Sequence, residues 1–261
     1  MISRNLDKAR DAFKRKDIDE MRRAHKERAP ERHMQEKGQY VKSVVYGGLD
    51  GIITTFAIVA GVSGASLSAG VVLILGFANL IADGFSMGVG DYLSSKSELE
   101  YNKAERERET WEVDHYPEGE KRELVEIYMG KGLSEEDAKT IVDRIAKHKK
   151  AWLDIMMLEE LGIVESDESP IRNAVATFIS FAAFGFVPLI AYVLSQFIPA
   201  MRPYAFATAS VLTGATLFTL GALKARITGR SWFMSGVEVF VVGGIAAVAA
   251  YLIGFMLSGL A

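Results

Sequence analysis

A polar stripe recurs along one otherwise apolar segment of the sequence. Its members are Asn79, Asp83, Met87 and Asp91, spaced four residues apart. Residues four apart lie on one face of an α-helix, so the spacing predicts a helix face that carries carboxylates and one thioether. Such ligands suit a divalent transition-metal ion better than Ca²⁺ or Mg²⁺, which take oxygen ligands. The alternative interpretation is that these side chains form hydrogen bonds to neighbouring helices.

The preceding apolar segment contains a single charged residue, Asp50, beside Gly47, Gly48 and Gly51. Glycine allows another backbone to approach closely or the helix to break locally. Ionisable residues at membrane depth are costly and usually mark an ion path. Asp50 and the stripe therefore predict a transport path for a divalent ion, although these ligands do not separate Fe²⁺ from Mn²⁺, Co²⁺ or Zn²⁺.

A second candidate site lies in residues 96–172, called the acidic domain below, which contain 21 acidic and 13 basic residues. Clustered carboxylates repel one another, which raises their pKa values unless a cation neutralises them. Helical spacing therefore predicts a cation site, whereas the alternative is a solvated surface with lysine and arginine partners. The candidate metal ligands are Glu105, Glu109, Glu112, Glu120, Glu123, Met156, Glu159 and Glu160.

Glu112 and His115 match the Glu-x-x-His element of di-iron bundles. The chain has one copy of this element, next to Pro117, where the helix should end. A membrane-anchored iron-oxidising or iron-storing protein is therefore the alternative function, and a metal sensor or scaffold without transport is a third. No nucleotide-binding loop or nucleophile elbow occurs in a suitable context, so we predict neither an enzyme nor ATP-driven transport.

The residue types that are missing limit the chemistry further. Cysteine is absent, and the four histidines lie outside the apolar segments. Disulfides, thiolate zinc sites and cysteine nucleophiles are thereby excluded. A metal site must rely on carboxylate oxygens, to which methionine sulfur can be added. We expect no prosthetic group and only a divalent transition-metal ion bound as substrate. A nucleic-acid partner is not expected.

These candidate sites need membrane helices to position them. Five apolar segments are long enough, at about 1.5 Å per residue, to cross a hydrocarbon core about 30 Å thick. Pro188 should kink the third. We therefore predict an all-α membrane protein with five transmembrane helices and a helical metal-binding domain inserted between spans two and three. The predicted spans are residues 43–64, 69–95, 173–198, 203–223 and a fifth from residue 231 towards the C-terminus.

The predicted domains are a basic N-terminal helix (residues 1–42), spans one and two (43–95), the acidic domain (96–172) and spans three to five (173–261). The N-terminal part should form one helix over residues 4–37. The helix of span two should continue to about Val113, because no helix breaker lies between Gly90 and Pro117. Three further helices are predicted over about 117–130, 134–147 and 149–161.

The charge distribution predicts the orientation. Residues 1–42 contain 13 basic and 8 acidic side chains, and Lys224, Arg226 and Arg230 make the loop before span five basic. By the positive-inside rule both segments are cytoplasmic, which places the acidic domain in the cytoplasm and the C-terminus outside. The first forty residues lack the apolar stretch of a cleavable signal, so the first span should act as the targeting element.

Two further features predict contacts between helices. Gly84 and Gly88 form a small-xxx-small pair, a pattern typical of tight packing between membrane helices, and so indicate a homodimer seam. Glu238, in span five, should either pair with Arg226 or Arg230 or line a vestibule at the membrane surface.

Two strings are the most specific features of the chain, YGGLDGIITTFAIVAG at residues 46–61 and SMGVGDYLSSKSE at residues 86–98. With the Glu-rich insert that follows them, they resemble the vacuolar iron transporter family over residues 38–261 and leave the basic N-terminal helix outside the match. The resemblance implies a homodimer in the lipid bilayer with five spans per subunit. It also implies that Fe²⁺, and often Mn²⁺, leaves the cytosol in exchange for protons.

Carried over to this sequence, the resemblance assigns metal ligands in the membrane to Asp50 and Met87. Well-known members have a glutamate eight residues before this methionine, where this chain has Asn79, and Asp83 could supply the missing carboxylate. In the acidic domain the resemblance assigns the ligands to Glu109, Glu112, Glu120, Glu123, Met156 and Glu160. The compact chain favours the plasma membrane of a prokaryote, with a vacuolar membrane as the alternative.

Overall fold

The computed structural model describes residues 6–26, 35–164, 169–228 and 231–260, and every regular element in these ranges is a helix. The all-α prediction is therefore confirmed for this part of the chain. The chain divides into two compact units, Met1–Lys42 and Ser43–Ala261, and each is described separately.

The first unit contains two short helices, α1 (Leu6–Arg15) and α2 (Ile18–Lys26). The prediction of one helix over residues 4–37 is wrong, because the chain turns between the two helices. Lys16 has a positive φ of 57°, and the Asp17 carboxylate accepts hydrogen bonds of 2.9 Å from the backbone N–H groups of Asp19 and Glu20. Asp17 thus caps α2 and ends the first helix, as aspartate does at helix starts.

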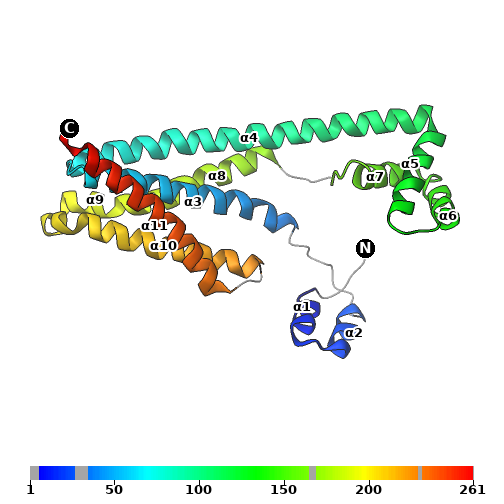
Figure 1. Cartoon of the computed structure of the whole chain (residues 1–261), viewed down its shortest axis with the longest axis horizontal. Helices are drawn as coiled ribbons and strands as arrows, with labels where there is room; N and C mark the ends of the chain where they lie inside the picture. Colours follow the sequence, from blue (N-terminus) through cyan, green and yellow to red (C-terminus); the bar gives the residue numbers. More distant parts are fainter. Residues whose placement is uncertain (1–5, 27–34, 165–168, 229–230, 261) are drawn as a thin grey trace. The chain divides into compact units, whose positions relative to one another are not determined.

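The second unit contains the apolar helices, which we call the membrane bundle. Four helical segments are long and apolar enough to cross a membrane: 42–64 within α3 (Gln35–Gly64), α4 (Ala69–His115), 199–225 around α10 (Ala205–Thr228), and 232–260 around α11 (Trp232–Leu257). A fifth span results if the bent pair α8 (Pro170–Gly185) and α9 (Val187–Phe197) is counted as one. The bundle therefore agrees with the five predicted spans (Figure 1).

The third predicted span is broken rather than simply kinked. α8 and α9 meet at Phe186 with a bend of 46°. Pro188 lies in the first turn of α9, where its missing N–H costs no helical hydrogen bond. Proline therefore begins the second half of the span instead of bending its interior.

Glycines bring the helices of the bundle into close contact. A Cβ atom on Gly47 or Gly51 of α3 would lie 2.6 Å from the carbonyl oxygen of Thr177 or 2.3 Å from that of Phe181, both on α8. Side chains larger than hydrogen would therefore push α3 away from α8. Close approach through small residues is the usual way in which membrane helices pack.

Gly84 and Gly88 also pack inside the chain. Their Cα atoms face Phe178, Phe181 and Ala174 of α8, with distances of 3.1–3.4 Å from an added Cβ atom to the nearest α8 atoms. This small-residue pair is therefore used for the contact between α4 and α8 and gives no support to the homodimer seam predicted from it.

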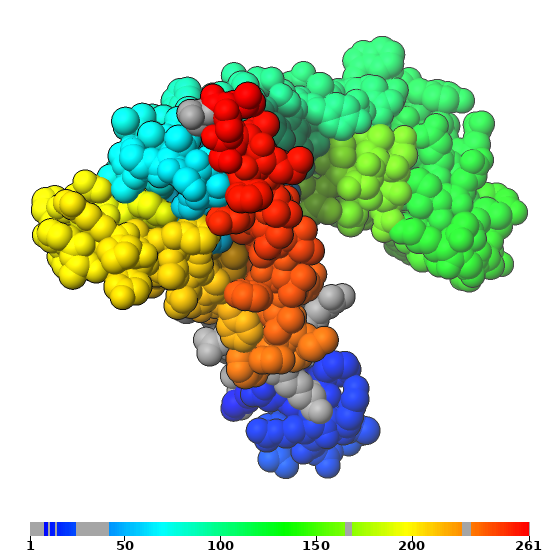
Figure 2. All heavy atoms as spheres, turned by 60° about the vertical axis from the view of Figure 1, so that its left-hand side comes forward, coloured from blue at the N-terminus to red at the C-terminus, as the bar shows by residue number. Residues whose placement is uncertain are grey.

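Helix α11 exposes a largely apolar surface. Only 11% of the most apolar window of α11 is buried, and Figure 2 shows this helix, in orange to red, lying on the surface of the bundle. Exposed side chains such as Ile245, Ile253 and Phe255 are suited to contact with lipid. Exposed apolar residues on long helices are expected where hydrocarbon replaces water as the solvent.

The acidic domain is built from the C-terminal half of α4 together with α5 (Pro117–Gly130), α6 (Glu135–Ile145) and α7 (Lys149–Glu159). These helices confirm the predicted ones within a few residues. Ser134 caps α6 as predicted, because its Oγ accepts a hydrogen bond of 3.1 Å from the backbone N–H of Asp137. A small core that includes Val113, Leu124 and Trp152 holds the four helices together.

Gly254 tests the packing of the bundle. A Cβ atom there would lie 1.9 Å from the carbonyl oxygen of Gly61, so Gly254→Ala must separate α11 from α3. We expect it to lower the free energy of unfolding by about 1–3 kcal/mol, measured by thermal unfolding in detergent. Gly244→Ala is the matched control, because a Cβ atom at Gly244 on the same helix meets no atom within 4 Å. Equal stability of the two variants would contradict this packing.

Candidate functional site

Carboxylates from three helices of the acidic domain converge on one place. One carboxylate oxygen each of Glu109, Glu112 and Glu120 lies within 4.8 Å of the others, and the same holds for Glu120, Glu123 and Glu160. Glu120 belongs to both groups. The five residues therefore form one set, called the acidic cluster below, with members on α4, α5 and directly after α7.

Two members of the acidic cluster are buried. Glu109 is fully buried and Glu120 is 5% exposed. The Oε2 atom of each lies away from solvent and accepts no hydrogen bond within the described part of the chain. Burying an ionised carboxylate without partners is costly, so such groups bind a proton or a cation, or are paired. The two oxygens are therefore the best placed atoms of the domain for coordinating a metal ion.

The same burial raises pKa values in the cluster. Burial, with the nearby carboxylates of Glu160 and Glu120, raises the pKa of Glu109 to about 7, although Arg108 acts in the opposite direction. Burial, followed by repulsion from Glu123 and Glu112, raises the pKa of Glu120 to about 7. The pKa of Glu160 is raised too, again chiefly by burial. Glu109 and Glu120 therefore gain or lose a proton near neutral pH.

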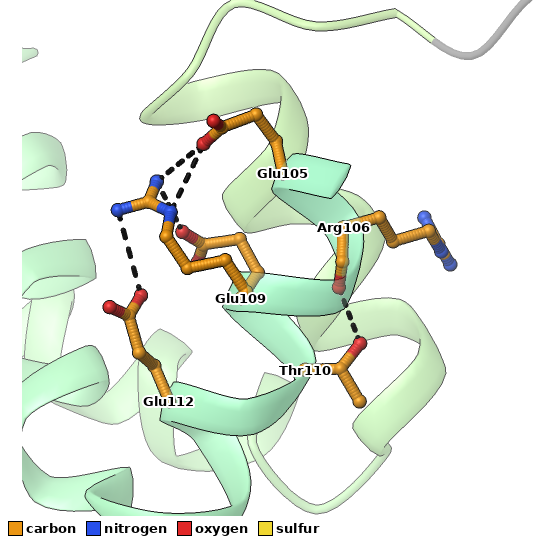
Figure 3. A network of polar contacts seen from close by, with 6 residues as sticks. Glu105, Arg106, Glu109, Thr110 and Glu112 are labelled. Atoms are coloured by element: carbon orange, nitrogen blue, oxygen red, sulfur yellow. Dashed lines mark hydrogen bonds and ion pairs between the residues drawn. The ribbon is translucent and has the colours of Figure 1, made fainter. Parts of the chain in front are cut away.

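Arg108 is part of this site, although sequence analysis did not single it out. Its Nη2 lies 2.8 Å from Glu105 Oε2 and 3.1 Å from Glu109 Oε1, and its Nη1 lies 3.9 Å from Glu112 Oε2. Figure 3 shows these three carboxylates, with the contacts that they make drawn as dashed lines. The sequence did indicate these ion pairs, because Glu105 precedes Arg108 by three residues and Glu112 follows it by four, and residues at these spacings are neighbours on a helix.

The other candidate ligands of the acidic domain have different surroundings. Glu105 is attached to the cluster through Arg108, and Met156 is fully buried in the core one helical turn before Glu160. Glu159 forms an ion pair with Lys131 and does not belong to either carboxylate group. The structure thus brings together five of the predicted ligands directly and one more through an arginine.

His115 does not join the acidic cluster. Its ring stacks on Trp111 with a centroid distance of 4.4 Å, and its Nδ1 lies 2.8 Å from the carbonyl oxygen of Trp111. The exposed imidazole is therefore oriented by its own helix. The Glu-x-x-His interpretation, and with it the iron-oxidising alternative, receives no support from this geometry.

In the membrane bundle, the polar stripe of α4 lies beside α3. The side-chain amide of Asn79 donates a long hydrogen bond of 3.5 Å to Thr54 Oγ1. At the other end of the stripe, Asp91 accepts hydrogen bonds from Ser43 at 3.0 Å, from Ser95 at 3.4 Å and from Thr177. These hydroxyls come from α3, α4 and α8, so the helix-packing interpretation describes Asp91 well.

The remaining three candidate residues have no such hydrogen-bond network among the residues that the structure describes. Asp50 on α3 is half-buried and interacts electrostatically with Asp83, which is exposed on α4. Met87 is half-buried and packs against the main apolar core of the bundle. The carboxylates of Asp50 and Asp83, on two different helices, therefore repel each other, and the Met87 thioether lies one helical turn from Asp83.

Several residues of the bundle were missed because they carry no charge. Ser43, Thr54 and Thr177 are hydroxyl residues inside apolar segments, and such residues are common in membrane helices. Only their contacts with Asn79 and Asp91 reveal their role. The predicted pairing of Glu238 concerns side chains of residues 226 and 230 that lie outside the described ones, and Glu238 itself is exposed.

The raised pKa of Glu120 predicts a pH effect on stability. The pKa of Glu120 is about 7 in the folded protein, against 4.5 for an ordinary glutamate. The contribution of Glu120 to the free energy of unfolding is therefore complete below about pH 4.5 and is lost as the pH rises through about 7. In chelator at pH 8, Glu120→Gln should therefore raise the melting temperature by roughly 2–4 °C or more. At pH 5 the gain should vanish.

Thermal unfolding followed by tryptophan fluorescence measures this effect, since Trp111 and Trp152 lie in the acidic domain. Glu107→Gln is the control, because the Glu107 side chain is 72% exposed and pairs only loosely, at 3.9 Å, with Lys103. A melting temperature at pH 8 that falls in Glu120→Gln would show that Glu120 is not a strained carboxylate.

Comparison with known proteins finds relatives along most of the chain. A sequence model described as the VIT family matches residues 41–255. The chain is 42% identical to a vacuolar iron transporter of Toxoplasma gondii, with 97% of this chain and 89% of that protein aligned. It is 34% identical to a vacuolar iron transporter of Plasmodium falciparum (98% of each chain) and 35% identical to vacuolar iron transporter 1 of Arabidopsis thaliana (82% and 84%).

Two expectations change with these relatives. The similarity to the Toxoplasma and Plasmodium proteins extends into the N-terminal segment, which the predicted match had left out. The relatives are eukaryotic proteins named as vacuolar, which does not support the prokaryotic plasma membrane favoured by chain length. The multi-pass membrane protein itself agrees with the apolar helices of the bundle. The family model matches most of the chain, and relatives that are 34–42% identical align with nearly its whole length. The chain therefore belongs to the VIT family, and the relatives it matches are named vacuolar iron transporters.

Proposed function

We propose that this protein carries Fe²⁺, and also Mn²⁺, out of the cytosol in exchange for protons. The observation that carries the proposal is that one unbroken helix, α4, holds both candidate sites. Its apolar half contains Asp83 and Met87, and its polar half contains Glu109 and Glu112 of the acidic cluster. The printed names of the relatives support iron as the substrate.

In this proposal the acidic domain collects the metal ion on the cytosolic side. Glu109 and Glu120 each have a buried, unpaired Oε2 atom, and Glu112, Glu123 and Glu160 lie beside them. Hard carboxylate oxygens bind Fe²⁺ and Mn²⁺ readily, and the thioether of Met156 favours softer transition ions. The positive-inside rule, applied to the basic N-terminal segment, supports the cytosolic location.

Asp50, Asp83 and Met87 form the membrane step of the proposed path. Asp83 is exposed on the surface of the single chain, which is unfavourable for a carboxylate at membrane depth. A second subunit at this surface would cover Asp83 and complete the ligand set, so we propose a homodimer with the path between its subunits. Asn79 would contribute an amide oxygen, and Asp91 would hold α3, α4 and α8 together beneath the path.

Proton exchange follows from the chemistry of the ligands. A carboxyl group must lose its proton to bind a metal ion, so one group cannot hold both at once. Metal binding on the cytosolic side then releases protons, and the higher proton concentration in an acidic compartment drives release of the metal. The vacuolar names of the relatives make a vacuole-like membrane our proposed location.

Flux measurements test the membrane path. In proteoliposomes with an acidic interior, Asp50→Asn and Met87→Ala should each lower the initial rate of Fe²⁺ or Mn²⁺ uptake at least about tenfold, equivalent to about 1.4 kcal/mol of barrier. The rate of the unchanged protein should collapse when an ionophore removes the pH gradient. A metal-sensitive dye inside the liposomes reports the flux.

Two control variants change the same residue types elsewhere. Met234 on α11 is 68% exposed, and Asp143 forms a surface ion pair of 3.0 Å with Lys121, so Met234→Ala and Asp143→Asn should transport at the normal rate. Normal flux in Asp50→Asn and Met87→Ala would refute the assigned path. Metal binding without any flux in the unchanged protein would instead favour a sensor or scaffold.

A further inference from the structure

We propose that Arg108 is a built-in competitor of the metal ion, an internal cation that a divalent ion must displace from Glu109 and Glu112. This inference rests on the proposed role of the acidic cluster as a metal site. It assigns to Arg108 control over how tightly the site holds its substrate.

The position of Arg108 carries the inference. Its guanidinium lies within 3.9 Å of Glu105, Glu109 and Glu112, two of which are cluster members (Figure 3). Nη2 binds Oε1 of Glu109, whereas Oε2 of the same carboxylate is buried and has no hydrogen-bond partner among the described residues. Arg108 and a metal ion would therefore share the carboxylate of Glu109 from two sides.

Electrostatics makes this sharing unfavourable. A divalent ion bound to Glu109, Glu112 and Glu120 would place two positive charges a few ångströms from the guanidinium, and repulsion at that distance is strong where water is partly excluded. The same carboxylates attract a doubly charged ion more than a singly charged arginine. The metal ion should therefore displace Arg108, whereas Na⁺ and K⁺ gain too little to do so.

The side chain of Arg108 is free to leave. It is 46% exposed, so water can solvate the displaced charge. Its Nε and Nη2 both approach the same oxygen of Glu105, at 3.1 Å and 2.8 Å, which lets Glu105 keep hold of the arginine after the other contacts break. The pairs with Glu105 and Glu112 are partly exposed to water and are correspondingly weak, whereas the buried Glu109 exchanges the charge of Arg108 for that of the metal ion.

The expected consequence is a site that binds its substrate without trapping it. A transporter needs binding strong enough to attract the ion and weak enough to release it. When the metal ion leaves, Arg108 returns and separates carboxylates that would otherwise repel one another. Glu105 is then a positioning residue for Arg108 rather than a metal ligand.

Titration of the full-length protein in detergent with Mn²⁺ at pH 8 tests the inference. Arg108→Gln should bind Mn²⁺ about 3- to 10-fold more tightly, because the metal ion no longer has to displace a competing cation. The Mn²⁺ affinity of Arg108→Lys should lie between those of the unchanged protein and Arg108→Gln. A lysine ammonium cannot contact three carboxylates with the fork geometry of an arginine guanidinium. Lys103→Gln removes the same charge from an exposed position on α4 and should change the affinity less than about twofold.

Thermal unfolding supplies a second readout. Without metal, Arg108→Gln should melt at a lower temperature than the unchanged protein, and Mn²⁺ should raise its melting temperature by more. Equal or weaker Mn²⁺ binding by a folded Arg108→Gln protein would overturn the inference. If Arg108→Gln fails to fold, Arg108→Lys replaces it in the test. Tighter Mn²⁺ binding by Arg108→Lys would then support the inference, and equal or weaker binding would overturn it. A complete lack of Mn²⁺ binding by the unchanged protein would refute the proposed metal site instead.

Discussion

The cost of burying negative charge controls the chemistry of this protein. Glu109 and Glu120 are removed from water with one oxygen each left without a hydrogen bond, and their neighbours are carboxylates as well. Such an arrangement is stable only when protons or cations neutralise it. Burial raises the pKa values of these glutamates and favours the contacts of Arg108 with the cluster. The affinity for a divalent ion that we propose has the same origin, because each of these effects neutralises buried negative charge.

Helix α4 connects this chemistry to the membrane. Its 47 residues include glycines that pack on α8, a polar stripe beside α3 and three glutamates around Arg108. The Asp91 carboxylate joins α4 to α3 and α8 through hydroxyl groups, which leaves Asp50 and Asp83 as the interacting carboxylates further along the bundle. One regular stripe thus has a structural end at Asp91 and a remaining part that we propose as the ion path.

Small residues decide how the bundle is assembled. Glycines of α3, α4 and α11 face carbonyl oxygens or side chains of neighbouring helices at distances that exclude a methyl group. The Gly84–Gly88 pair illustrates the ambiguity of such motifs, since the same pattern serves contacts within a chain and between chains. Here α8 covers the pair, and the exposed Asp83 is a better indication of where a second subunit would bind.

The sequence alone determined the helical class, the apolar spans, the boundaries of the acidic domain helices and most of the clustered glutamates. Apolar length, glycine and proline positions and four-residue spacing are local properties, and local properties can be read from neighbouring residues. Only the tertiary structure decided that Glu120 meets Glu109 and Glu112 from another helix and that Glu160 joins Glu120 and Glu123. It also decided that Glu159 pairs with Lys131 and that hydroxyl groups hold Asp91. These outcomes depend on contacts between residues far apart in the chain, and periodicity within one helix holds no information about what faces it.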